Sequence, residues 1–186
     1  MNVDQLSLAM KKLLFTLCML ACIRSLQAQT PVNPRIAPQG TVYDLEEVYL
    51  PDTTLTYKVV IDLKSSNNPP EKVNRGLNSV ARLVNLYAVG GVPAGQVKIA
   101  VAVHYTATPI VLTHAGYRRK YGIDNPNLAL IDSLHKAGVE FFVCGQSLVA
   151  RDYARQYVNP QVRIALSMLT VVTEYAARGY TVLTFD

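Results

Sequence analysis

Short runs of β-branched and aromatic residues alternate along this chain with segments of helical periodicity. Four runs have the length and composition of buried strands, namely residues 58–63, 97–103, 139–143 and 180–184. Between the first two runs, apolar residues recur every three or four positions, at Val73, Leu77, Val80 and Val84. Parallel strands need long crossovers, which are usually helices, so this alternation predicts an α/β domain. We expect a mostly parallel sheet covered by helices on both faces.

Proline, asparagine and glycine residues indicate where the helices begin and end. Thr108-Pro109 and Asn125-Pro126 are typical of helix starts, whereas Gly122 and Gly138 are typical of helix ends. These signals predict one helix from residue 108 towards Gly122 and another from Asn125 to Gly138. A long final helix is expected to carry five apolar residues, Ile164, Ala165, Met168, Leu169 and Val172.

Two segments of different character precede the predicted domain, which occupies residues 57–186. Residues 29–56 are dotted with prolines and lack periodicity, which favours an extended N-terminal arm. Residues 1–28 combine two lysines, a short apolar run and a small residue at Ala28, the pattern of a signal peptide. The expected mature chain is periplasmic or secreted, with no stable membrane insertion after cleavage. Acylation at Cys22 is the alternative form of export, and Met10 is the alternative start.

Cleavage after residue 28 changes the charge and the cysteine content. It removes three of 18 Lys and Arg and one of 13 Asp and Glu, which leaves 15 against 12 and a net charge of +3. The one basic run left, residues 118–120, falls near a predicted helix end, so nucleic-acid binding is not expected. Cleavage also removes Cys18 and Cys22. The remaining Cys144 has no partner for an internal disulfide.

Three polar residues stand at the ends of predicted strands. They are Asp62, His104 and Cys144, on the first, second and third strands. Ligands of open parallel sheets bind outside the carboxyl ends of the strands, so these residues are candidates for a shared site. A thiol close to an imidazole and to a helix N-terminus has a lowered pKa, which makes Cys144 and His104 the candidate catalytic residues.

The turn after Cys144 is the candidate ligand-binding segment. Gly145, Gln146 and Ser147 form a strand-to-helix turn whose backbone N–H groups could face the sulfur or an anion, and Asp62 joins them as a candidate ligand-binding residue. A structural interpretation is also open for each position. Cysteine is often simply buried, a histidine can bond a neighbouring loop, and a strand-end aspartate can cap a turn.

No motif for a metal or a cofactor is present. The histidines show no i, i+4 pair, so no metal site is expected. The chain lacks a dinucleotide-binding or phosphate-binding glycine loop, because Gly90-Gly91 follows a predicted helix and precedes a strand. A nucleophilic serine elbow is absent as well. We therefore expect no cofactor.

The order and spacing of five sequence blocks resemble the DsrE/DsrF-like (YchN-like) family, and its exported branch in particular. The blocks are residues 57–60, 77–86, 103–104, 125–128 and 137–148. The resemblance implies a three-layer α/β/α fold, assembly as a homotrimer or homohexamer, and sulfur handling, with Cys144 at the position of the family's cysteine. One departure is Tyr105, which follows His104 where many relatives have glycine, so a side chain stands where backbone could approach a ligand.

Two functional hypotheses follow. In the first, the protein is a sulfur carrier or thiol-exchange protein in which Cys144 accepts a sulfane sulfur from a donor protein or passes it to an acceptor protein. In the second, the protein is a non-catalytic homo-oligomeric binding module, and Cys144 is packed and inert. Accessibility of the thiol to a small alkylating reagent distinguishes the two.

Overall fold

Five parallel strands form the central sheet of this protein, which we describe from a computed structural model for residues 30–66 and 68–185. The order across the sheet is β6-β5-β4-β3-β7, and every neighbouring pair is parallel. The strands are β3 (Tyr57–Leu63), β4 (Val97–Val103), β5 (Glu140–Cys144), β6 (Val162–Ala165) and β7 (Thr181–Phe185). The predicted α/β fold is confirmed.

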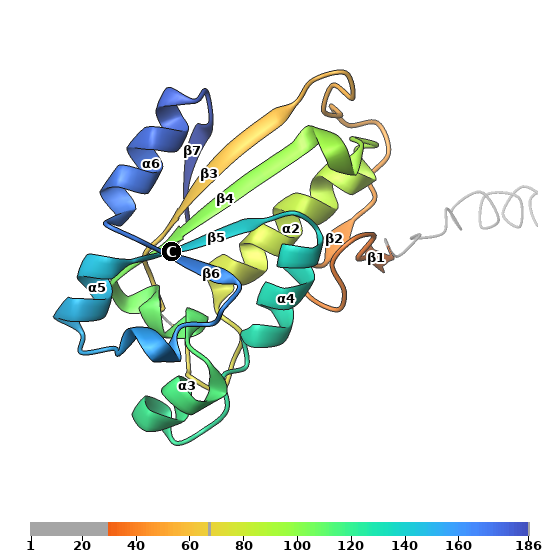
Figure 1. Cartoon of the computed structure of the whole chain (residues 1–186). Coiled ribbons are helices and arrows are strands. Elements are labelled where there is room, and N and C mark those ends of the chain that lie inside the picture. The colour runs from red at the N-terminus through yellow and green to blue at the C-terminus, as the bar shows by residue number, and fades with distance from the viewer. Residues whose placement is uncertain (1–29, 67, 186) are drawn as a thin grey trace, which may run out of the picture. The chain divides into compact units, whose positions relative to one another are not determined.

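Helices cover both faces of the sheet (Figure 1). On one face lie α2 (Arg75–Val89) and α4 (Leu128–Lys136), and on the other lies α6 (Met168–Ala177). Beyond the carboxyl ends of the strands lie α3 (His114–Tyr121) and α5 (Gly145–Ala150). The short 3₁₀ helices are η1 (Ala94–Gln96), η2 (Tyr105–Val111) and η3 (Arg155–Tyr157). This arrangement leaves the carboxyl edge of the sheet bordered by α5 and by the start of α6.

Alternation along the strands divides the core into two clusters of unequal size. The larger cluster joins Ile61, Val101 and Phe141 of the sheet to Leu77 of α2 and Leu134 of α4. Its side chains are almost completely buried, and each contributes roughly 1.5–3 kcal/mol to the stability of the fold. The smaller cluster is formed by Val60, Ala100, Ala102, Val171 and Tyr175. Its alanines leave room above the sheet for the aromatic ring from α6.

The N-terminal arm packs against α2 through one buried amide. Within the arm, β1 (Pro31–Val32) and β2 (Val42–Tyr43) form a two-stranded antiparallel sheet. Asn85 of α2 is fully buried, and its Oδ1 accepts hydrogen bonds from the backbone N–H groups of Arg35 and Ile36. Its Nδ2 donates to the carbonyl oxygens of Ile36, Gln39 and Gly40. One side chain thereby satisfies five hydrogen bonds with an irregular segment.

The helix predicted to start at residue 108 begins later in the structure. Residues 105–111 form η2, Leu112 is extended, and Thr113 is the N-cap of α3. The extension at Leu112 is explained by its antiparallel bridge to Val158, which pulls this residue out of a helical conformation. The predicted end is confirmed, because Gly122 adopts a left-handed conformation with φ of 74° as the C-cap of α3.

Replacing Thr113 with alanine is expected to lower the free energy of unfolding by about 1 kcal/mol. The Thr113 side chain accepts a hydrogen bond from the Gly116 N–H, which otherwise has no partner in the first turn of α3. Chemical denaturation measures the loss. Thr173→Ala, on the exposed surface of α6, is the control, since Thr173 Oγ1 bonds only carbonyls of its own helix. An equal loss in both variants would contradict the capping role.

The prediction of the long final helix is wrong at its start. Ile164 and Ala165 belong to the edge strand β6, and α6 begins only at Met168. Ile164, Met168 and Val172 are spaced four residues apart, so the helical pattern of α6 extends into the four-residue strand before it. This spacing explains the error. Leu166 and Ser167 separate the two elements, and Ser167 is the N-cap of α6. Its backbone is extended, with φ of −155°, and its side chain accepts a hydrogen bond from the Leu169 N–H.

The predicted signal peptide, residues 1–28, lies outside the residues that the structure describes. Within residues 30–66 and 68–185, no helix combines the length and the apolar composition that a bilayer crossing requires.

Candidate functional site

The three candidate residues lie at the carboxyl edge of neighbouring strands. Asp62 is the penultimate residue of β3, His104 follows β4, and Cys144 ends β5. Alternation places Asp62 and His104 on the α6 face of the sheet, because Val60 and Ala102 two residues earlier pack against α6. The parallel register aligns β3 with β4 and β4 with β5, so the fold gathers three predicted residues in one region.

Asp62 and His104 form a direct pair. The Nε2 atom of His104 lies 2.6 Å from Oδ1 of Asp62, and their side chains are 17% and 19% exposed. A hydrogen bond also joins the His104 N–H to the Leu63 carbonyl at 3.0 Å, which fixes the backbone at the end of β4. When Nε2–H donates to the carboxylate, Nδ1 keeps its lone pair and can accept a proton. The pair therefore orients a base at the edge of the sheet.

Cys144 lies between the N-termini of α5 and α6. Burial raises the pKa of its thiol, but hydrogen bonds from Ser147, from the Met168 N–H and from Ser167 lower it by more. The pKa of Cys144 is therefore below its ordinary value, and the thiolate fraction at neutral pH is larger than for a free cysteine. The Ser167 Oγ is 3.9 Å from the sulfur. Cys144 itself is only 5% exposed.

Ser147 connects the thiol to the segment after β4. Its Oγ accepts a hydrogen bond from the Tyr105 N–H at 3.1 Å, which leaves the hydroxyl proton free to donate to Cys144. Tyr105 holds this position with φ of 51°, in the left-handed region that favours glycine. Tyr105 is thus a strained residue that supports the site, and it is 60% exposed.

Gly145 and Gln146 position the turn after Cys144. A Cβ on Gly145 would lie 2.8 Å from the carbonyl oxygen of Ala165, so only glycine permits the close approach of β6. Gln146 donates from Nε2 to the Leu166 carbonyl at 3.3 Å. Both residues therefore tie the start of α5 to the end of β6, and they carry the backbone geometry that presents Ser147 to the sulfur.

Two residues of the site were missed in the sequence, Ser167 and Met168. They were missed because the final helix was predicted to include β6, which placed Ser167 inside a helix. The sequence did contain a signal for the true start of the helix. Serine is a favoured N-cap residue, and Ser167 stands directly before the apolar stripe of α6. Within the described residues, no hydrogen bond joins His104 to Cys144, and the groups that lower the thiol pKa belong to the two helix starts.

In the part of the chain that the structure describes, no group of three or more His, Cys, Asp or Glu side chains could hold a metal ion. The arrangement offers a thiol whose pKa is lowered by hydroxyl and backbone donors, on the same edge of the sheet as a carboxylate-oriented imidazole. Such a group can attack a sulfur atom and hold the resulting anion.

Fold and site together define a class of protein, a parallel α/β domain with one free cysteine at the carboxyl edge of its sheet. The model of the DsrE/DsrF-like family matches residues 58–185, so the chain belongs to the DsrE/DsrF-like family. No curated protein sequence matches the chain.

Two solved structures share the fold. MTH1491 of Methanobacterium thermoautotrophicum, described as a protein of unknown function, is 19% identical with a TM-score of 0.53. The ychN protein of E. coli is 17% identical with a TM-score of 0.52. Each alignment covers 69% of this chain and 99% of the other.

Proposed function

We propose that the protein is a sulfur carrier that holds a sulfane sulfur as a persulfide on Cys144. The observation that carries the proposal is the lowered pKa of a thiol held between two helix starts. Membership of the DsrE/DsrF-like family supports sulfur chemistry as the class of reaction. A persulfide is more acidic than a thiol, so the same donors from Ser147, Ser167 and Met168 suit both forms.

Loading of Cys144 with sulfur needs no external oxidant. The Cys144 thiolate attacks the outer sulfur of a donor persulfide, a new sulfur–sulfur bond forms, and the donor's bond breaks. The donor leaves as a thiolate, and Cys144 carries the transferred sulfur as a persulfide anion. His104, oriented by Asp62, supplies or takes the proton that the entering and leaving groups exchange with the site. Unloading is the same exchange with an acceptor thiolate.

The surroundings of Cys144 suit a protein donor or acceptor. Leu166, directly after β6, and Leu169, in the first turn of α6, are 73% and 67% exposed. Large exposed apolar side chains beside a nearly buried thiol give a partner a surface to bind while its own sulfur enters. Export of the chain after cleavage at residue 28 and assembly as a homotrimer or homohexamer are part of the same proposal.

The test of the carrier function is the mass of the chain cleaved after residue 28, which keeps Cys144 and lacks Cys18 and Cys22, after exposure to inorganic polysulfide. We expect the wild type to gain one sulfur atom, removable by a reducing agent, and Cys144→Ser to gain none. A second readout is transfer of that sulfur to a small thiol in solution. Sulfur addition that persists in Cys144→Ser, or a wild type that takes up no sulfur, would overturn the proposal.

A non-catalytic binding module is the second candidate, and the burial of Cys144 at 5% exposure favours it. In that case the thiol is packed and reacts only when the fold opens. Alkylation by iodoacetamide in native buffer decides between the two, since a carrier must react at neutral pH without denaturant and a packed cysteine must not.

A further inference from the structure

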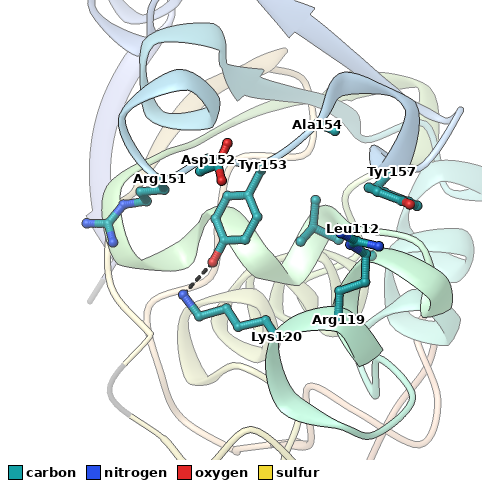
Figure 2. A pocket seen from close by; sticks show the side chains of 9 residues that line it. Leu112, Arg119, Lys120, Arg151, Asp152, Tyr153, Ala154 and Tyr157 are labelled. Atoms are coloured by element: carbon teal, nitrogen blue, oxygen red, sulfur yellow. Dashed lines mark hydrogen bonds between the residues drawn. The ribbon is translucent and has the colours of Figure 1, made fainter.

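A cavity of about 440 Å³ lies between α3 and the loop that follows α5. Figure 2 shows Arg119 and Lys120 rising from α3 towards Tyr153 and Tyr157 on the opposite wall, with Arg151 at the edge. None of Asp62, His104, Cys144 and Ser147 lines it. Its volume is in the range of small-molecule binding sites. The cavity is therefore separate from the thiol site.

The charge of the chain is concentrated around this cavity. Residues 114–124 and 151–157 together hold five Lys and Arg against two Asp, a net charge of +3. Residues 29–186 as a whole also carry +3, so the charges elsewhere balance. Among the described residues, Arg119, Lys120 and Arg151 form no ion pair. A concave wall with an unbalanced positive charge attracts anions.

The cavity also has hydrogen-bond donors without acceptors. Lys120 donates to the Tyr153 hydroxyl, whose own proton has no acceptor in the described residues. Burial raises the pKa of Tyr153, so the phenol stays protonated and remains a donor at neutral pH. The Arg119 guanidinium lies over the Tyr157 ring, 5.3 Å from its centroid, and makes no hydrogen bond within the described residues. The stacking holds a planar fork of donors in place.

The walls are fixed by backbone contacts. The Thr113 N–H donates to the Tyr157 carbonyl at 2.7 Å, and the Asn159 N–H donates to the Val111 carbonyl at 2.9 Å. Gly116 allows Tyr157 to lie against α3, because a Cβ there would be 2.6 Å from the Tyr157 Cβ. The two walls are thereby held together before any ligand binds, and a preformed site loses little entropy on binding.

We propose that this cavity binds a small anion with two or more negative charges, of the phosphate or carboxylate type. Arg119 and Lys120 would contact the anion, and the Tyr153 hydroxyl would donate a further hydrogen bond. Asp152 is the one carboxylate in the lining, and Figure 2 shows it directed away from Lys120. The site is independent of the carrier function of Cys144.

The experiment titrates the folded protein with pyrophosphate and, separately, with citrate in an isothermal calorimeter. We expect at least one of them to bind with one site per chain and a Kd below about 1 mM. The arm that binds identifies the phosphate or the carboxylate type. Arg119→Gln combined with Lys120→Gln is expected to weaken binding at least about tenfold, since each removes a charge-assisted hydrogen bond. Tyr153→Phe is expected to weaken it less.

The matched control is Arg82→Gln combined with Lys98→Gln, which removes the same charge from exposed positions outside the cavity. It is expected to bind as the wild type does, and circular dichroism checks that both double variants fold. An equal loss in the control, or no saturable binding of either anion below about 1 mM, overturns the proposal.

Discussion

Replacing Ser147 with alanine is expected to slow alkylation of Cys144 at pH 7 by about tenfold. The Ser147 hydroxyl and N–H are among the groups that lower the pKa of the thiol, and alanine removes the hydroxyl donor while burial continues to raise the pKa. A hydrogen bond to a charged group is worth about 1.5 kcal/mol, which corresponds to about one pKa unit. The rate of iodoacetamide labelling follows the thiolate fraction, so its pH profile moves to higher pH.

Two further variants make this measurement specific. Ser133→Ala on α4 removes a hydroxyl that bonds only the Ala129 carbonyl, and its labelling profile is expected to match the wild type. His104→Asn tests the imidazole, which forms no hydrogen bond with Cys144 in the described residues, and its shift is expected to be smaller than that of Ser147→Ala. A larger shift in His104→Asn would mean that the imidazole, rather than the helix starts, controls the thiol.

Replacing Asn85 with alanine is expected to lower the free energy of unfolding by about 3 kcal/mol. The change leaves the N–H groups of Arg35 and Ile36 and the carbonyls of Ile36 and Gly40 without the partner that the amide supplies. Each buried polar group without a partner costs about 1–3 kcal/mol, and movement of the arm recovers part of the loss. Urea denaturation measures the difference in stability.

Trypsin shows where that loss falls. Because Asn85 holds the arm, we expect cleavage at Arg35 to accelerate in Asn85→Ala before the rest of the domain becomes sensitive. Ser79→Ala is the control on the same helix, since its hydroxyl bonds only the carbonyl of Arg75. If arm cleavage in Asn85→Ala matched that control, the arm would be held by other contacts, and the assignment to Asn85 would be wrong.

Much of the fold could be predicted because the central strands are runs of buried apolar residues, which are easily recognised in the sequence. Buried runs such as residues 99–103 have no polar side to confuse them with amphipathic helices, and glycine ended α3 where expected, at Gly122. The edge strand β6 was not predicted, because its sequence lacks such a distinct pattern. It has four residues, alternates poorly, and continues in register with the helical stripe of α6. Tertiary pairing with β5, which no local pattern reports, makes it a strand.

The sequence predicted the residues of the candidate site that stand at strand ends, but not the groups that surround them. Topology brings Asp62, His104 and Cys144 to one edge, as parallel strands require. The pairing of His104 with Asp62, rather than with the thiol, depends on side-chain distances that sequence spacing does not contain. The role of Ser167 depends on where α6 starts, so one error in an element boundary hid a hydrogen-bond partner of the thiol.

The position of α6 couples the stability of its first turn to the ionisation of Cys144. Within the described residues it is the one helix on its face of the sheet, and its first turn stabilises the ionised sulfur. Such coupling is reciprocal, so the ionised sulfur must stabilise that first turn equally. Adding or removing charge at Cys144 thus alters how often the first turn of α6 frays, and amide hydrogen exchange at Met168 would report the ionisation of the thiol.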